Sequence, residues 1–330
     1  MTAAALASSR EGTRGLRRTD PRRDMAGVAR VVQIAFAGQL DASGQRMLRD
    51  MRLLGAAGWL GHLLGRWLLP PGSSPDGFVW LEGGTVVGNV SLLSVDGAPR
   101  RWVMANVAVH PDHRRRGIGR ALVLAALELA AQRQAETVVL QVDRANAAAR
   151  ELYHSLGFRV TSTRTTWIRP RGLPRPHPTG LDGLRLRAYP EWRDQWELGR
   201  RVEPDGFWWP FLPDERLFRG SGVPAAVRVD WTRHWVWKPE AQVLASLSAH
   251  VRWLNSYRFL LLVDPAHGGA VEKAILSRAL AELPEGSGVV LEYPAGEAES
   301  ELWELGFRPD RTLTWMAIDL PAQRLGERLG

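Results

Sequence analysis

The spacing of hydrophobic and polar residues predicts a run of alternating strands and helices in the first half of the chain. Residues 101–109 are rich in apolar side chains, as in a buried strand, and residues 121–131 are mostly Ala, Leu and Val, as in a buried helix. A second apolar run over residues 137–142 predicts another strand. A further helix should begin at Asn146, a residue type favoured at helix N-termini, and should end at Gly157. This part of the chain is therefore expected to form a strand–helix–strand–helix unit.

The pattern of the first half returns in the second half at a spacing of about 150 residues. Residues 263–267, Val-Asp-Pro-Ala-His, echo residues 109–113, Val-His-Pro-Asp-His, and an apolar helix follows each. Leu-Gly-Phe-Arg occurs at residues 305–308 and again at residues 156–159. Because the spacing equals the length of one such domain, we interpret the chain as two tandem domains of one kind.

A stretch rich in proline and glycine separates the two halves. The four prolines and three glycines between Trp167 and Gly183 cannot continue a helix or a central strand, which predicts a linker. The expected organisation is a disordered N-terminus at 1–14, a first domain at 15–169, a linker at 170–183, a second domain at 184–320 and a C-terminal tail at 321–330.

Residues 109–122 have the order expected of an anion-binding cradle. A strand end is followed by arginines, by two glycines spaced by one residue, and by the start of an apolar helix. The free N–H groups at a helix N-terminus attract anions, and Gly117 and Gly119 let a phosphate approach the main chain. The sequence lacks the third glycine of a Rossmann loop, where Leu122 stands, and the Lys-Ser/Thr pair of a Walker A motif. Arg114, Arg115, Arg116 and Arg120 would supply positive charge around a diphosphate.

Two motifs in this unit together resemble the GCN5-related N-acetyltransferase (GNAT) family. The family pattern Arg/Gln-x-x-Gly-x-Gly/Ala is matched by Arg114, Gly117 and Gly119. The later pattern Asn-x-x-Ala-x-x-Leu-Tyr-x-x-x-Gly-Phe is matched by Asn146, Ala149, Leu152, Tyr153, Gly157 and Phe158. The resemblance implies an α/β fold with two tandem domains, each a mostly antiparallel twisted sheet flanked by helices around a β-α-β-α core that binds acyl-CoA.

The resemblance also implies acetyl-CoA as the cofactor and assigns the residues that would hold it. Backbone N–H groups of residues 115–120 would bind the pyrophosphate, and the main chain of residues 107–109 would run beside the pantetheine arm. A bulge in that strand commonly opens a slot for the arm. One amide from Val107 or Val109 could reach the thioester oxygen. The cofactor-binding set implied is Val107, Ala108, Val109, Arg114, Arg115, Arg116, Gly117, Ile118, Gly119, Arg120 and Asn146, with no metal ligand.

Tyr153 is the candidate general acid that protonates the departing thiolate, because the pKa values of a phenol and a thiol differ by only a unit or two. The alternative is that Tyr153 only packs against its helix. The general base stays open, because many relatives place a glutamate where this chain has Asn106. Water, His110, Glu82 or an acceptor amine of low pKa could replace it.

The second copy lacks the residues that would carry the chemistry. Gly-Gly-Ala-Val-Glu at residues 268–272 replaces the arginines and spaced glycines, and Glu272 would repel a diphosphate. The tyrosine position falls on Leu302, or on Trp303 with a one-residue gap. Pro294 stands where the first half has Asp143. We therefore expect this copy to keep the fold without the activity.

Two segments are candidates for contacts with the acceptor substrate. Residues 25–69 carry an apolar surplus that would form a partly hydrophobic acceptor site as well as core. Eight tryptophans of the second half would fill its core or, alternatively, line a pocket for an apolar or cationic substrate. The residues concerned are Phe36, Met47, Met51, Trp59, His62 and Trp67 in the first segment, and Trp192, Trp196, Trp208, Trp209, Trp231, Trp235, Trp237 and Trp253 in the second.

Composition and charge narrow the function classes. The absence of cysteine excludes disulfides, thiolate metal sites and cysteine nucleophiles. The segment 53–69 is too short and too interrupted by polar residues to span a bilayer, and no signal peptide is recognisable, so a cytoplasmic location is expected. Residues 1–165 carry a net charge of +9 and residues 166–330 a net charge of −1. The basic half favours a phosphorylated cofactor, and the lack of a long basic run or a zinc spacing argues against nucleic acid.

The leading hypothesis is an acetyl-CoA-dependent N-acetyltransferase with one working site in the first domain. A primary amine, on a small molecule or a peptide N-terminus, would attack the thioester directly in a ternary complex. The alternative is a regulatory protein that binds acyl-CoA without turnover. The assembly expected is a monomer or a homodimer.

Overall fold

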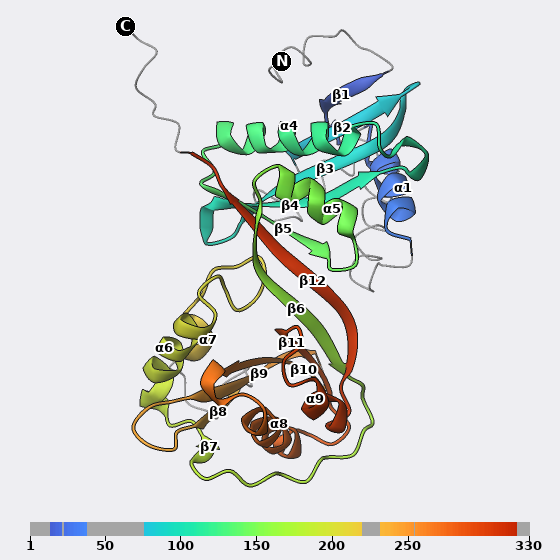
Figure 1. Cartoon of the computed structure of the whole chain (residues 1–330). Helices are drawn as coiled ribbons and strands as arrows, with labels where there is room; N and C mark the ends of the chain where they lie inside the picture. Colours follow the sequence, from blue (N-terminus) through green and yellow to red (C-terminus); the bar gives the residue numbers. More distant parts are fainter. Residues whose placement is uncertain (1–13, 22, 38–75, 220–231, 254, 322–330) are drawn as a thin grey trace, which may run out of the picture. The chain divides into compact units, whose positions relative to one another are not determined.

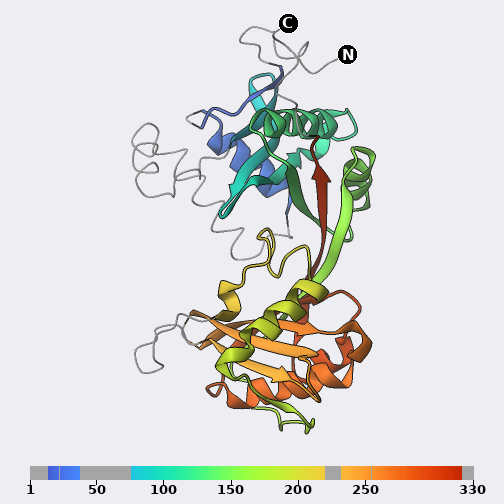
Figure 2. The same ribbon diagram turned by 90° about the vertical axis from the view of Figure 1, so that its left-hand side faces the viewer.

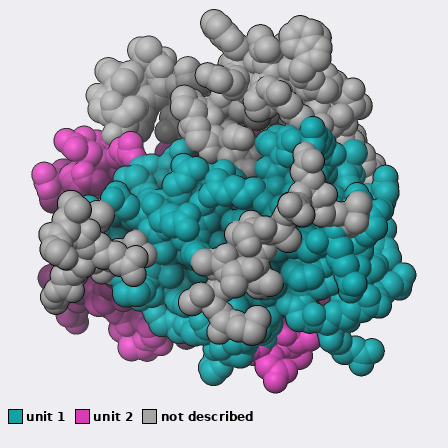
Figure 3. Space-filling model, turned by 90° about the horizontal axis from the view of Figure 1, so that it is seen from above, with its two compact units in different colours: residues 1–140, 152–159, 317–330 teal, residues 141–151, 160–316 magenta. Residues whose placement is uncertain are grey.

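The computed structural model describes residues 14–21, 23–37, 76–219, 232–253 and 255–321 of the 330. The chain divides into two compact units, which Figure 3 colours separately. Unit 1 consists of residues 1–140, 152–159 and 317–330, and unit 2 consists of residues 141–151 and 160–316. Three strands, β5, β6 and β12, contribute residues to both units.

The strands form one mixed sheet (Figure 1) in the order β1-β2-β3-β4-β5-β12-β6-β11-β10-β9-β8-β7. Along the chain they are β1 (Gly15–Arg18), β2 (Asp76–Glu82), β3 (Thr85–Val95), β4 (Ala98–Val109), β5 (Thr137–Asp143), β6 (Arg159–Arg169), β7 (Leu184–Leu186), β8 (Arg233–Trp237), β9 (Ala245–Trp253), β10 (Ser256–Val263), β11 (Gly288–Pro294) and β12 (Arg308–Asp319). Strand β4 pairs with β5, and β10 with β11, in parallel. The expected mixed α/β class is confirmed.

Helices connect the strands. They are α1 (Met25–Ala35), α4 (Ile118–Gln132), α5 (Ala147–Ser155), α6 (Trp192–Val202), α7 (Arg216–Arg219), α8 (Ala270–Glu282) and α9 (Glu299–Glu304), with short 3-10 helices at Pro111–His113, Tyr189–Glu191 and Pro265–His267. None of the helices in the described ranges is both long and apolar enough to cross a membrane.

The predicted strand–helix–strand–helix unit is present as β4, α4, β5 and α5. Strand β4 begins at Ala98 and helix α4 at Ile118, each three residues earlier than the apolar pattern indicated. Asn146 accepts a hydrogen bond from the N–H of Ala149 at 3.1 Å, as expected of a residue that caps α5. Residues 170–183, the predicted linker, contain no helix or strand.

In unit 1, α1 and α4 pack on opposite faces of β2 and β3 (Figure 1). Val79 and Leu81 of β2 belong to the apolar cluster formed by α1. On the other face, a Cβ built on Gly88 would lie 3.0 Å from Ile118 of α4, closer than an ordinary contact, so glycine at this position favours the close packing of this helix. The close approach places the N-terminus of α4 against the beginning of β3.

Unit 2 has the same layered arrangement. Trp235 and Trp237 of β8 point into a core that includes α8, while Val236 between them packs in the cluster that contains Leu198 of α6. Figure 2 shows α6 lying across the strands of this unit. The order strand, 3-10 helix, helix, strand, helix, strand occurs from β10 to β12 as it does from β4 to β6.

Most of the described tryptophans in the aromatic-rich segment fill the core, as the first interpretation expected. Trp192, Trp235 and Trp237 are buried, and Trp196 and Trp208 pack against the α6 cluster. Trp209 instead lines a pocket. Trp231 and the side chain of Trp253 lie outside the described residues.

Candidate active site

Strand β4 contains the bulge that the family resemblance implied. It pairs with β3 through Gly88 opposite Val109 and Asn89 opposite Ala108, and the register shifts before pairing resumes at Ser91 and Ala105. Asn106, inside the shift, has a φ of +53°, in the left-handed region. The bulge turns the main chain of residues 106 and 107 out of the regular ladder.

Asn89 holds this bulge from the neighbouring strand. Its side chain is 1% exposed, and its Nδ2 donates a hydrogen bond to the carbonyl oxygen of Asn106 at 3.0 Å. A buried amide that bonds a left-handed residue fixes a conformation that most residues avoid. Sequence reasoning missed Asn89, although a polar residue inside an otherwise apolar strand was the available signal.

From Met104 onwards, no strand in the described part of the chain pairs with β4 on its other side. Its parallel pairing with β5 covers only Arg101–Thr137, Trp102–Val138 and Val103–Val139, although β4 continues to Val109. The edge of residues 104–109 that follows therefore separates from β5. A strand edge with free N–H and C=O groups can bind an extended ligand by main-chain hydrogen bonds.

The junction between β4 and α4 leaves a set of N–H groups available. Within the described part of the chain, no backbone hydrogen bond uses the N–H groups of residues 115–120, and the first helical bond runs from Ala121 to Gly117. Arg115 and Gly117 have positive φ values, +60° and +76°. A Cβ on Gly117 would meet no atom within 4 Å, so the space beside it is open. The junction thus has the backbone shape of an anion site.

Four arginines surround this junction, and all four side chains are exposed: Arg114, Arg115, Arg116 and Arg120. Arg114 donates through Nε to the carbonyl of Val109 at 3.3 Å, and Arg120 donates to Ser155 Oγ at 3.0 Å. In the described ranges none of the four forms an ion pair with a carboxylate. Their charge is therefore available to an anionic ligand.

Tyr153 lies on α5 in the same unit. Its side chain is 6% exposed, and its ring packs edge-on against Phe158 with the ring centres 5.7 Å apart. Burial raises the pKa of the Tyr153 hydroxyl well above its ordinary value of 10. Next to it, Leu152 lies 3.5 Å from the position a Cβ would take on Gly119, so α5 packs against the start of α4.

The candidates for a general base have other partners. The His110 ring caps the 3-10 helix by accepting from the N–H of Asp112 at 3.4 Å, and Glu82 forms an ion pair with Arg14 at 3.2 Å. Of the residues proposed for the acceptor site, Phe36 packs against the α1 core. Met47, Met51, Trp59, His62 and Trp67 lie outside the described residues.

The corresponding junction of unit 2, between β10 and α8, is closed by a side chain. Glu272 on the first turn of α8 is 2% exposed, and Oε1 lies 3.4 Å from the position of a Cβ on Gly268. Tyr293 donates its hydroxyl hydrogen to Glu272 Oε1 at 2.9 Å. Burial raises the pKa of Glu272, and the hydrogen bond from Tyr293 opposes the rise. A buried carboxyl group thus lies at the helix start that is open in unit 1.

Comparison with known proteins gives a consistent result. Residues 56–158 match the model of the acetyltransferase (GNAT) family. The chain is similar to the [ribosomal protein bS18]-alanine N-acetyltransferase of Escherichia coli, with 42% identity over 62 residues, which cover 19% of this chain and 42% of that protein. It is also similar to N-alpha-acetyltransferase 30 of Xenopus laevis, with 34% identity over 90 residues, or 27% of this chain and 30% of the relative. The matched part of the chain therefore spans less than half the length of each of these relatives.

The fold of the whole chain also has a counterpart. A GCN5-related N-acetyltransferase from Sphaerobacter thermophilus superimposes with a TM-score of 0.57 at 16% identity, covering 92% of this chain and 95% of the other. At this identity the similarity shows a shared fold.

Proposed function

We propose that this chain, whose residues 56–158 belong to the acetyltransferase (GNAT) family, transfers an acetyl group from acetyl-CoA to a primary amine. The observation that carries the proposal is the open β4–α4 junction of unit 1, with its free N–H groups and unpaired arginines. The active site lies in this unit, and the C-terminal copy keeps the fold without binding the cofactor.

The residues of the junction suit a diphosphate. The N–H groups of residues 115–120 would hold it, because each is free of an intramolecular bond in the described structure. Arg114, Arg115, Arg116 and Arg120 would neutralise its charge. The separated edge of β4 from Val107 to Val109 would take the pantetheine arm, and Asn146 would add a contact from α5.

The chemistry follows from these positions. The amide of Val107 or Val109 would stabilise the negative charge that develops on the thioester oxygen during attack. A C–N bond forms between the amine and the acetyl carbon, the C–S bond breaks, and the sulfur takes a proton. Tyr153 supplies that proton. Burial keeps the phenol protonated at neutral pH, as a general acid must be, but the raised pKa makes the transfer less favourable than the ordinary phenol value indicated.

The acceptor is a primary amine on a small molecule or on a peptide N-terminus. The similarity to a [ribosomal protein bS18]-alanine N-acetyltransferase and to an N-alpha-acetyltransferase supports this class. With Asn106 in place of an acidic base, the amine would lose its proton through water or would arrive with a low pKa. The same residue motivates the alternative function, a protein that binds acyl-CoA and does not turn it over.

Thiol release separates the two functions. The full chain is mixed with acetyl-CoA and with a panel of amines and short peptides, and free thiol is measured. Release that depends on the amine supports the transferase. Saturable binding of acetyl-CoA without release from any amine of a broad panel supports the regulatory alternative.

A further inference from the structure

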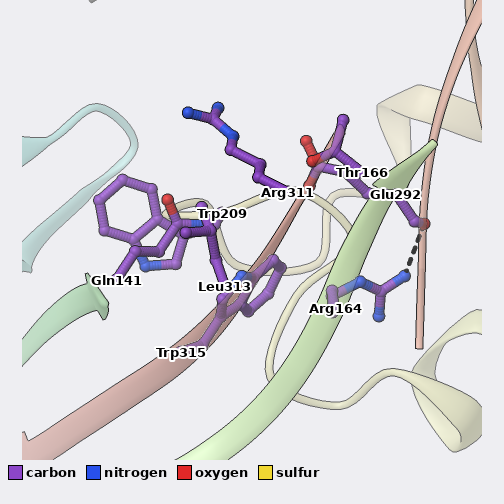
Figure 4. A pocket seen from close by; sticks show the side chains of 8 residues that line it. All are labelled: Gln141, Arg164, Thr166, Trp209, Glu292, Arg311, Leu313 and Trp315. Carbon is purple, nitrogen blue, oxygen red and sulfur yellow. Dashed lines mark hydrogen bonds between the residues drawn. The ribbon is translucent and has the colours of Figure 1, made fainter. Parts of the chain in front are cut away.

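A pocket of about 240 Å³ lies in unit 2, and none of its lining residues is assigned to the acetyl-CoA site. Its walls come from β5, β6, β11 and β12 and from the loop that follows α6, and Figure 4 shows the side chains around the opening. The lining residues are Gln141, Arg164, Thr166, Trp209, Glu292, Arg311, Leu313 and Trp315. By volume it would hold about eight water molecules, so it suits a small organic molecule.

The lining offers more hydrogen-bond donors than acceptors. Arg164 and Arg311 are guanidinium groups, which only donate, and the Gln141 amide and the Thr166 hydroxyl can also donate. The acidic residue of the lining, Glu292, already accepts a hydrogen bond from Arg258 at 2.9 Å. Arg164 is paired in the same way with Glu203, so the Arg311 guanidinium is the positive group that would meet a ligand carrying acceptor atoms and negative charge.

Two donors in the lining lack a partner in the described part of the chain. They are the indole Nε1 of Trp209 and the Nε of Arg164, both buried. Arg164 is 2% exposed, forms an ion pair with Glu203, and donates to the carbonyl of Glu292 at 3.0 Å, so its side chain is fixed in place. Buried donors without acceptors are rare in proteins and call for an explanation such as a bound molecule.

The rest of the lining is flat and apolar. The ring of Trp315 lies 5.5 Å from the guanidinium carbon of Arg164, and Leu313 and the Trp209 ring complete this part of the wall. Aromatic faces favour flat apolar groups. The arginines argue against the cationic substrate considered for these tryptophans from sequence.

We propose that this pocket binds a small organic carboxylate with a flat apolar body. The Arg311 guanidinium and the unpartnered N–H donors of Arg164 and Trp209 would receive the carboxylate, and the indole rings and Leu313 would contact the body. None of these residues belongs to the set assigned to acetyl-CoA, and the proposal does not depend on the transferase activity.

Three ligands of one shape test the charge requirement on the full chain. They are 3-phenylpropanoate, its neutral amide and 3-phenylpropylamine, each titrated by calorimetry. We expect the carboxylate to bind at least about tenfold more tightly than the amide or the amine, which is the effect of one charge-assisted hydrogen-bonded contact. Absence of carboxylate binding at millimolar concentration, or equal binding of all three, would overturn the proposal.

Matched variants locate the site. Arg311→Gln should weaken carboxylate binding about tenfold, whereas Arg308→Gln, an exposed arginine on the same strand, should change it less than twofold. Trp209→Phe should weaken it several-fold, whereas Trp303→Phe, on the surface of α9, should not. Thermal unfolding checks that each variant is folded.

Two results would contradict this location. The first is a carboxylate affinity that survives in both Arg311→Gln and Trp209→Phe. The second is a loss of affinity in Arg116→Gln, which would place the carboxylate at the β4–α4 junction of unit 1. If Arg311→Gln fails to fold, Trp209→Phe and the ligand series still decide.

Discussion

The β4–α4 and β10–α8 junctions have the same succession of elements but opposite electrostatics. Each consists of a strand, a 3-10 helix, a glycine of positive φ and a helix. In unit 1 the N–H groups of residues 115–120 are free and exposed arginines stand beside them, whereas in unit 2 the buried carboxyl of Glu272 lies beside Gly268 at the start of the helix. A backbone path of this kind is therefore not enough to make an anion site, because a single acidic residue can occupy it from within.

The largest expected difference between the two units comes from substituting a tyrosine in each. Tyr153→Phe removes the proposed general acid and should lower turnover about 10²–10⁴-fold while acetyl-CoA affinity stays within about twofold. Tyr293→Phe, a buried tyrosine of unit 2, should leave the rate unchanged. Steady-state thiol release and calorimetry measure the two quantities. An unchanged rate in Tyr153→Phe would remove this residue from the mechanism.

The glycine at the start of α4 comes next. Ala at Gly117 must adopt a φ of +76° and places a methyl group in the open space, so acetyl-CoA affinity should fall about tenfold. Gly97 has the same φ and the same open surroundings in the β3–β4 turn. Gly97→Ala should therefore lower the stability by a similar amount without changing the affinity for acetyl-CoA. Equal acetyl-CoA affinities in the two variants would contradict an anion site at the start of α4.

A substitution at Asn89 tests whether the bulge of β4 contributes to catalysis. Asn89→Ala removes the hydrogen bond to Asn106 and leaves a buried carbonyl without its partner, so it should lower kcat about fivefold and destabilise the fold by about 1–3 kcal/mol. Leu92→Val, which shortens a buried side chain of β3 outside the bulge, is the control: it should also destabilise the fold but should keep kcat. A full kcat in a destabilised Asn89→Ala protein would mean that the bulge only supports folding.

The smallest effect concerns Glu272 and pH. Burial raises its pKa above the ordinary value of 4.5, so the folded state binds this proton more tightly than the unfolded state does. The charge of Glu272 therefore does not lower the free energy of unfolding below about pH 4, where the group is protonated. It destabilises the protein as pH rises through the raised pKa. Glu272→Gln should raise the unfolding midpoint by about 2–4 °C at pH 8, roughly 1 kcal/mol, and by less at pH 4.

The control for that prediction is Glu240→Gln, which changes an exposed carboxylate of unit 2 and should show no such dependence on pH. A gain for Glu272→Gln that is equal at pH 4 and pH 8 would show that the charge of Glu272 is not what destabilises the protein.

The local elements of the core could be predicted from sequence because each has its own signal. The apolar run of α4, the cap at Asn146 and the glycines at 117 and 157 identify elements without reference to the rest of the chain. The position of β12 between β5 and β6 could not be predicted, because strand order depends on pairing between segments far apart in sequence.

In the candidate site, too, some features could be predicted from the sequence and others could not. The arginines and glycines of the junction follow from a motif. The sequence predicted that Glu272 would repel a diphosphate at the start of α8. It did not predict the hydrogen bond between Glu272 and Tyr293, because that bond depends on how β11 and α8 pack together. The contact of Asn89 with Asn106 also required the strand register, and the unit 2 pocket draws its walls from four strands and a loop. Such contacts have no local pattern.

The most direct test of the central claim is the stoichiometry of coenzyme A binding to the full chain, measured by calorimetry for the native protein and for Arg114→Glu/Arg116→Glu. The account predicts one site per chain in the native protein and no measurable binding after the charge reversal. Two equivalent sites per chain, or binding that survives the charge reversal, would contradict it.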